Sequence, residues 1–66
     1  MRTAEDVQHY LEGVDYLAGP EDLTIAARTN GAPTIFFELL GLLPTAAEFY
    51  GPGEVAEQLE RIRGLV

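Results

Sequence analysis

The fold is decided by residues 30–44, which read NGAPTIFFELLGLLP and combine a helix stop, a helix start and the most apolar run of the chain. Asn30 and Gly31 can supply a residue at positive φ that ends one helix, and Pro33 suits the first turn of the next helix. The stretch therefore predicts two helices joined by a short turn. In length and turn, this central pair resembles a helix-turn-helix.

The second half of this stretch predicts a helix over about residues 33–43 that is apolar on more than one side. Only two residues between 35 and 43 lack a large apolar side chain, whereas a surface helix needs a single apolar stripe. Phe36 and Phe37 are adjacent, and neighbours on a helix are separated by about 100°. At least one of these two rings therefore needs a second surface, so the helix is either central or interfacial.

The length of 66 residues allows one domain with a small core, predicted to span residues 1–66. The content of 47% hydrophobic and 23% charged residues is typical of a folded domain. Disulfides and thiolate metal sites are excluded because the chain has no cysteine. Domains below roughly 70–80 residues usually gain extra support, and association is the support that remains.

The formal net charge is −7, with eleven acidic residues against four arginines and no lysine. Such a charge argues against nucleic-acid binding, because proteins bind the phosphate backbone with cations. The N-terminal residues 1–6 lack the apolar core of a signal peptide, and no apolar run approaches the roughly 18 residues of a membrane span. We therefore expect a soluble, cytoplasmic protein with no membrane span.

A first helix is predicted from Thr3, which is expected to cap its amides, to a stop at Gly13. Apolar residues recur at helical spacing along it and form one stripe. The members of this stripe are Val7, Tyr10, Leu11 and Val14.

Two further helices are predicted to start at Pro20 and near Pro52, since proline is preferred in a first helical turn. The expected buried residues of the former helix are Leu23, Ala26 and Ala27, with Ile25 as a further candidate. Those of the latter are Val55, Leu59 and Ile62. Between them, the loop at 45–51 carries two adjacent aromatic residues, one of which is expected to fold over the core. The fold class predicted for the chain is all-α, with four short helices in one compact domain.

Residues 10–16, which read YLEGVDY, resemble the opening signature of the bacterial domain-of-unknown-function family numbered 2795. Further matches follow in the family's order: Asp22-Leu23, Ala27, Asn30-Gly31-Ala32, Leu40, Leu43-Pro44, Pro52 and Glu54-Val55. Leu17 and Gly51 stand where members usually have proline and serine, and the third helix is less charged than is typical. The resemblance implies a small helical domain without an established activity. The departures from the family pattern suggest a specialised, partner-bound member.

His9 is the one histidine, and its helical neighbours Glu5, Asp6 and Glu12 have a spacing that could gather a metal. A solvated acidic face explains the same pattern, and we predict no metal site. Paired carboxylates at helix starts are explained by the helix dipole. No nucleophile stands beside a base, so we predict no catalytic residues, no cofactor, no small-molecule substrate and no enzymatic activity.

Asp15 and Tyr16 lie in the loop between the first two helices. Loop aspartates commonly bond nearby backbone amides. The structural interpretation is that Asp15 fixes the turn while Tyr16 covers the core.

The function predicted from these observations is a small acidic protein-protein interaction module or accessory subunit. It is expected to pack against a copy of itself or a larger protein by burying apolar surface within an acidic rim. The predicted contact residues belong to the third helix and the following aromatic loop: Phe36, Phe37, Leu40, Leu43, Phe49 and Tyr50.

The alternative is a regulator of nucleic-acid transactions, acting as a degenerate helix-turn-helix or by acidic mimicry of nucleic acid. The third helix offers no Arg, Lys, Asn or Gln between residues 34 and 43 for contacts to bases. Direct binding is therefore disfavoured, and salt-sensitive binding to a basic protein would favour mimicry.

Overall fold

The computed structural model describes residues 2–65 and confirms the all-α class. The helices are α1 (Thr3–Tyr10), α2 (Pro20–Thr29), α3 (Thr34–Gly41) and α4 (Pro52–Leu65). None of these helices, as far as the described residues go, is long and apolar enough to cross a membrane.

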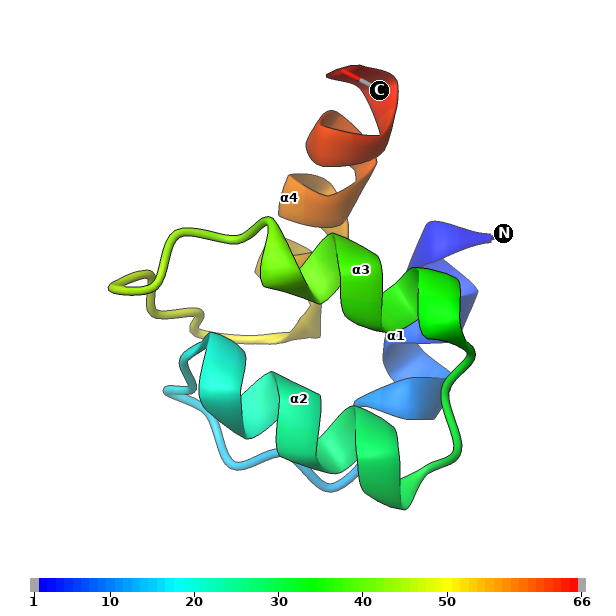
Figure 1. The fold of residues 1–66 in the computed structure, drawn as a ribbon. Helices are drawn as coiled ribbons and strands as arrows, with labels where there is room; N and C mark the ends of the chain where they lie inside the picture. The colour runs from blue at the N-terminus through cyan, green and yellow to red at the C-terminus, as the bar shows by residue number, and fades with distance from the viewer. Residues whose placement is uncertain (1, 66) are drawn as a thin grey trace.

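The helices pack as two pairs around one centre. α1 packs against α4, while α3 packs against both α2 and α4. Figure 1 shows α3 doubling back over α2 after the turn at residues 30–33, as expected for the predicted central pair. The core lies between these pairs, and each helix contributes buried apolar residues to it.

The predicted apolar stripes face the core, although some of their members, such as Tyr10 and Ile62, are only partly buried. Ile25 is the exception, because it is 54% exposed. Spacings of three and four residues place successive apolar side chains on one side of a helix. The buried apolar residues are Val7, Leu11, Ala18, Leu23, Ala27, Phe36, Leu39, Leu40, Leu43, Phe49, Val55 and Leu59.

Helix starts at Pro20 and Pro52 were predicted correctly, and Gly31 ends the second helix at φ +72°. The third helix was predicted to run to about residue 43, but α3 ends at Gly41. The amides of Leu42 and Leu43 bond carbonyl oxygens three residues back, at 3.1 Å each. This tighter turn closes the helix ahead of Pro44, whose ring disfavours helical geometry in the preceding residue.

The predicted cap at Thr3 is wrong, since Thr3 is the first residue of α1 and its side chain caps no amide. Its side chain is buried, and the Thr3 hydroxyl accepts a hydrogen bond from the guanidinium of Arg63 at 3.0 Å. The hydroxyl faces α4, so it ties the start of α1 to the last turn of α4 instead of serving its own helix. The first helix also ends at Tyr10, ahead of Gly13, which lies in the following turn at φ +90°.

An antiparallel β-bridge joins the two long connections of the chain. The amide of Ala18 donates to the carbonyl of Phe49 at 3.0 Å, and the amide of Phe49 donates to the carbonyl of Ala18 at 2.8 Å. Both residues are buried, which confirms that one of the two loop aromatics folds over the core. Leu17 and Tyr50, which flank the bridge, are exposed.

Candidate functional site

Four of the six predicted contact residues lie in the core, which corrects the expectation that they form an accessible surface. Phe36 is 0% exposed, Leu40 2%, Leu43 6% and Phe49 4%. Phe36 and Leu40 lie on one stripe of α3, and Leu43 continues it in the turn that follows the helix. The other helices enclose that stripe despite the small size of the domain. A charged residue at Leu40 would consequently disrupt folding, so it cannot report on an interface.

The remaining two predicted contact residues keep exposed surface. Phe37 lies on the side of α3 away from the centre of the core stripe and is only partly buried. Tyr50 is 78% exposed, and its backbone amide donates to a carboxylate oxygen of Glu54 at 3.1 Å. Of the two adjacent phenylalanines, Phe36 faces inward and Phe37 reaches the surface.

A second set of exposed apolar side chains on α3 was not named from the sequence. Ile35 is 49% exposed and Leu42 is 57% exposed. They are seven residues apart, and Leu42 retains helical backbone angles, so both lie along one line of the helix. Glu38 is exposed between them. We call these three residues the α3 flank.

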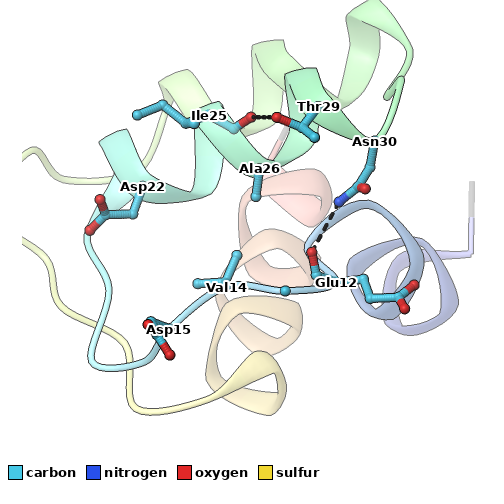
Figure 2. Close-up of a pocket in the computed structure, with 9 residues that line it drawn as sticks. Glu12, Val14, Asp15, Asp22, Ile25, Ala26, Thr29 and Asn30 are labelled. Atoms are coloured by element: carbon cyan, nitrogen blue, oxygen red, sulfur yellow. Dashed lines mark hydrogen bonds between the residues drawn. The ribbon is translucent and has the colours of Figure 1, made fainter.

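The surface carries an open groove of about 560 Å³ between α2 and the connection that precedes it. Figure 2 shows its two walls, the turn at residues 12–15 below and one side of α2 above. We call it the α2 groove. It is lined by Glu12, Gly13, Val14, Asp15, Asp22, Ile25, Ala26, Thr29 and Asn30.

Asn30 holds the turn against α2. Its side-chain amide donates hydrogen bonds to the carbonyl oxygens of Tyr10 at 2.9 Å and of Glu12 at 3.2 Å. At the start of α2, a carboxylate oxygen of Asp22 accepts the amide of Gly19 at 3.3 Å. The two bonds of Asn30 lie just after the last turn of α2, at one end of the groove. The bond of Asp22 lies at the first turn of α2, at the other end.

The α2 groove has an apolar floor, and carboxylates lie along its rim. Ile25 is 54% exposed, whereas Val14 and Ala26 are partly buried against the core. Figure 2 shows the side chains of Val14 and Ala26 pointing toward one another across the groove. The rim carries the carboxylates of Glu12, Asp15 and Asp22, and no cationic side chain lines the groove among the residues described.

Asp15 does not have the turn-fixing role predicted for it. Its side chain is exposed and makes no hydrogen bond or ion pair with any residue in the described range 2–65. Tyr16 does pack partly against the core. Its hydroxyl oxygen is buried without a hydrogen-bond partner in the same range, and burial raises the pKa of Tyr16 above its ordinary value of 10.0.

The residues considered for a metal site around His9 do not form one. His9 is exposed, and its ring contacts the Tyr10 ring edge-on at a centroid distance of 4.8 Å. The carboxylate of Glu5 pairs with Arg2 at 3.1 Å. Within the described part of the chain, no three His, Asp or Glu side chains gather as a metal site.

A model of the family described as "Protein of unknown function (DUF2795)" matches residues 2–56, from α1 into the first turns of α4. The chain belongs to this family. Neither the curated proteins nor the solved structures contain a match to this DUF2795 chain.

The residues that carry the resemblance have identifiable places in this DUF2795 fold. Residues 12–15, Asp22 and Asn30 all line the α2 groove. Gly13 supplies the positive φ of the turn, and Asn30 bonds the carbonyl of Tyr10 just before it. Asp22 accepts the amide of Gly19 at the start of α2. The spacing of Asp22, Ile25, Ala26 and Thr29 on one helical side was a sequence signal for the groove that the sequence analysis missed.

Proposed function

We propose that this DUF2795 member is a non-enzymatic protein-interaction module or accessory subunit that binds another protein through the α3 flank. The observation that carries the proposal is that α3 remains apolar on its outer side after its inner side is buried. Ile35 and Leu42 each keep about half of their surface exposed along one line. Apolar residues so arranged are typical of helix contacts with a partner.

Charge favours a different protein over a second copy as the partner. Each chain has a formal charge of −7, so two copies would repel one another at low ionic strength. Glu38 stands between the two apolar residues of the α3 flank and would face its own equivalent or a nearby acid in many symmetric dimers. A partner with a neutral or basic contact surface avoids this repulsion.

The absence of enzymatic activity is proposed because the candidate acids have structural roles. Asp22 caps α2, Glu54 accepts the amide of Tyr50, and Glu57 pairs with Arg61 at 3.1 Å. Acidic residues commonly stabilise helix starts by accepting backbone amides, and they commonly pair with arginine on helix surfaces. They therefore need no catalytic explanation.

Direct reading of DNA by α3 has no supporting observation. The exposed residues of the helix include Thr34, Ile35 and Glu38. Base recognition in the major groove relies chiefly on arginine, lysine, asparagine and glutamine. A protein partner fits the apolar and acidic character of this side of α3 better.

The proposal is tested by affinity capture from the cells that make the protein. The wild-type chain and a double variant, Ile35→Ser with Leu42→Ser, are each used as bait, and the proteins that they retain are compared. Ser removes the apolar surface without adding charge. Burying the exposed halves of both side chains is worth about 2 kcal/mol, so the double variant should bind roughly 30-fold more weakly.

Leu17→Ser is the matched control, because Leu17 is similarly exposed, at 46%, but lies outside both the α3 flank and the α2 groove. Proteins retained by the wild type and by the control, and lost with the double variant, would support the proposal. Identical captured proteins for all three chains would contradict it. Light scattering of the purified wild type should give a monomer, and a dimer that the double variant abolishes would identify a second copy as the partner.

A further inference from the structure

We infer that the α2 groove is a second interaction site, which binds a basic peptide segment of another protein with an apolar side chain between its cations. The inference is independent of the α3 flank, because the groove lies between α2 and the turn at residues 12–15. It rests on three observations about the groove: its charge, its floor and the distribution of its carboxylates.

The charge of the groove is not neutralised within the chain. Among the described residues, the three ion pairs join Arg2 to Glu5, Arg61 to Glu57 and Arg63 to Glu60, at 3.1, 3.1 and 3.7 Å. None of them involves a residue of the groove. Asp15 and Glu12 are exposed, and a ligand can approach both carboxylates without breaking a structural bond.

The apolar floor separates this groove from a simple acidic patch. Ile25 is 54% exposed beside the partly buried side chains of Val14 and Ala26. An inorganic cation gains nothing from such a floor, whereas an aliphatic side chain of a peptide loses its contact with water there. The ligand is therefore a chain that carries both apolar and cationic groups.

The carboxylates are spread along the groove and do not converge on one point. Figure 2 shows Glu12 near the Asn30 end, whereas Asp15 and Asp22 lie toward the other end. No metal-binding group of three or more such side chains is found within the part of the chain that the structure describes. Separated negative charges match cations that are themselves separated along an extended ligand.

A second copy of this chain is a poor source of those cations. The chain has four arginines, of which three already pair with glutamates of their own helix or its flanks. The fourth, Arg28, lies on α2 itself, outside the residues that line the groove. The repulsion between two chains of formal charge −7 further favours a basic partner.

The experiment is a titration of the isotopically labelled chain with a blocked hexapeptide of alternating arginine and leucine, followed by amide NMR shifts. The expected result is a set of saturable shifts confined to residues 12–15 and to α2. Affinity should fall at least fivefold between about 20 mM and about 300 mM NaCl, because the screening length shortens over that range. A serine–leucine peptide and an arginine–serine peptide should each bind at least fivefold more weakly.

The variant Glu12→Gln with Asp15→Asn tests the location. Both side chains are exposed, so folding should be preserved, and affinity for the arginine–leucine peptide should fall at least fivefold. Glu48→Gln with Glu60→Gln is the matched control, since it changes the net charge equally at exposed residues outside both the groove and the α3 flank. Its affinity should fall less than twofold.

Equal losses of affinity in the two double variants would overturn the inference, because they would show attraction to the overall charge alone. Shifts scattered over all four helices, or binding that ignores salt, would also overturn it. The proposed function is tested separately, since the variants of Ile35 and Leu42 leave the lining of the groove intact. Either proposal can therefore fail without the other.

Discussion

The side-chain amide of Asn30 donates a hydrogen bond to the carbonyl oxygen of Tyr10 at 2.9 Å, which joins the end of α2 to the end of α1 across 20 residues of sequence. A second bond, to the carbonyl of Glu12 at 3.2 Å, extends the link into the following turn. One polar side chain thus determines where the turn at residues 12–15 lies against α2. The shape of the α2 groove depends on it.

Replacing Asn30 by alanine is expected to destabilise the domain by about 1–3 kcal/mol, because two hydrogen bonds to backbone carbonyls are lost. Urea unfolding followed by far-UV circular dichroism measures this change. Thr29→Ala is the control, since the Thr29 hydroxyl bonds only the carbonyl of Ile25 within α2, at 3.1 Å. It should change stability by less than about 0.5 kcal/mol, and an equal effect of the two substitutions would contradict the role of Asn30.

The adjacent phenylalanines of α3 are expected to differ strongly in their contribution to stability. Phe36 is 0% exposed and its ring packs on that of Tyr10 at a centroid distance of 5.2 Å, so Phe36→Ala should cost about 3–5 kcal/mol. A domain of this length has roughly 3–10 kcal/mol in total. Phe37→Ala should cost about 1–2 kcal/mol, because Phe37 is only partly buried. Denaturant midpoints of the two variants decide the matter, and similar midpoints would refute the assignment.

The starts of α2, α3 and α4 and the end of α2 were predictable because they depend on local chemistry, whereas the ends of α1 and α3 were placed too late. Pro20, Pro33 and Pro52 mark helix starts through their fixed φ, and Gly31 marks a stop through its freedom at positive φ. The antiparallel bridge between Ala18 and Phe49 was not predictable, since it joins two residues without any alternating strand pattern around them.

The burial of four of the six predicted contact residues was missed for a different reason. Spacing showed that Phe36, Leu40 and Leu43 share one side of α3, but how completely the other helices cover that side depends on contacts distant in sequence. The α2 groove required the same non-local information. Its helical wall was visible in the spacing of α2, whereas its other wall is placed by the bonds of Asn30.

The stability of the domain is expected to fall above about pH 10 through Tyr16. Burial raises the pKa of its hydroxyl in the folded state, so the unfolded chain loses this proton at a lower pH. The contribution is fully present below the ordinary pKa of 10.0 and is lost as the pH rises through the folded value. Tyr16→Phe should flatten the alkaline loss of stability in urea midpoints measured from about pH 8 to about pH 11.

The same variant tests the buried hydroxyl, which lacks a hydrogen-bond partner within the described residues. At neutral pH, Tyr16→Phe should be at least as stable as the wild type, because no hydrogen bond is lost. Tyr50→Phe is the matched control, since Tyr50 is 78% exposed, and its alkaline profile should follow the wild type. A loss of stability in Tyr16→Phe at neutral pH would instead show that the hydroxyl is bonded.

Two glycine-to-alanine substitutions on either side of α3 are expected to have opposite signs. Gly31 lies at φ +72°, which costs an alanine about 1–2 kcal/mol although its Cβ would meet no heavy atom within 4 Å. Gly41 ends α3 at negative φ with the same open space, so alanine there should stabilise the helix by about 0.5–1 kcal/mol. Thermal unfolding of both variants measures the difference in stability. The stability of Gly31→Asn should lie between those of Gly31→Ala and the wild type. If the unfolding temperatures of both alanine variants changed in the same direction, the positive φ of residue 31 would not explain its glycine.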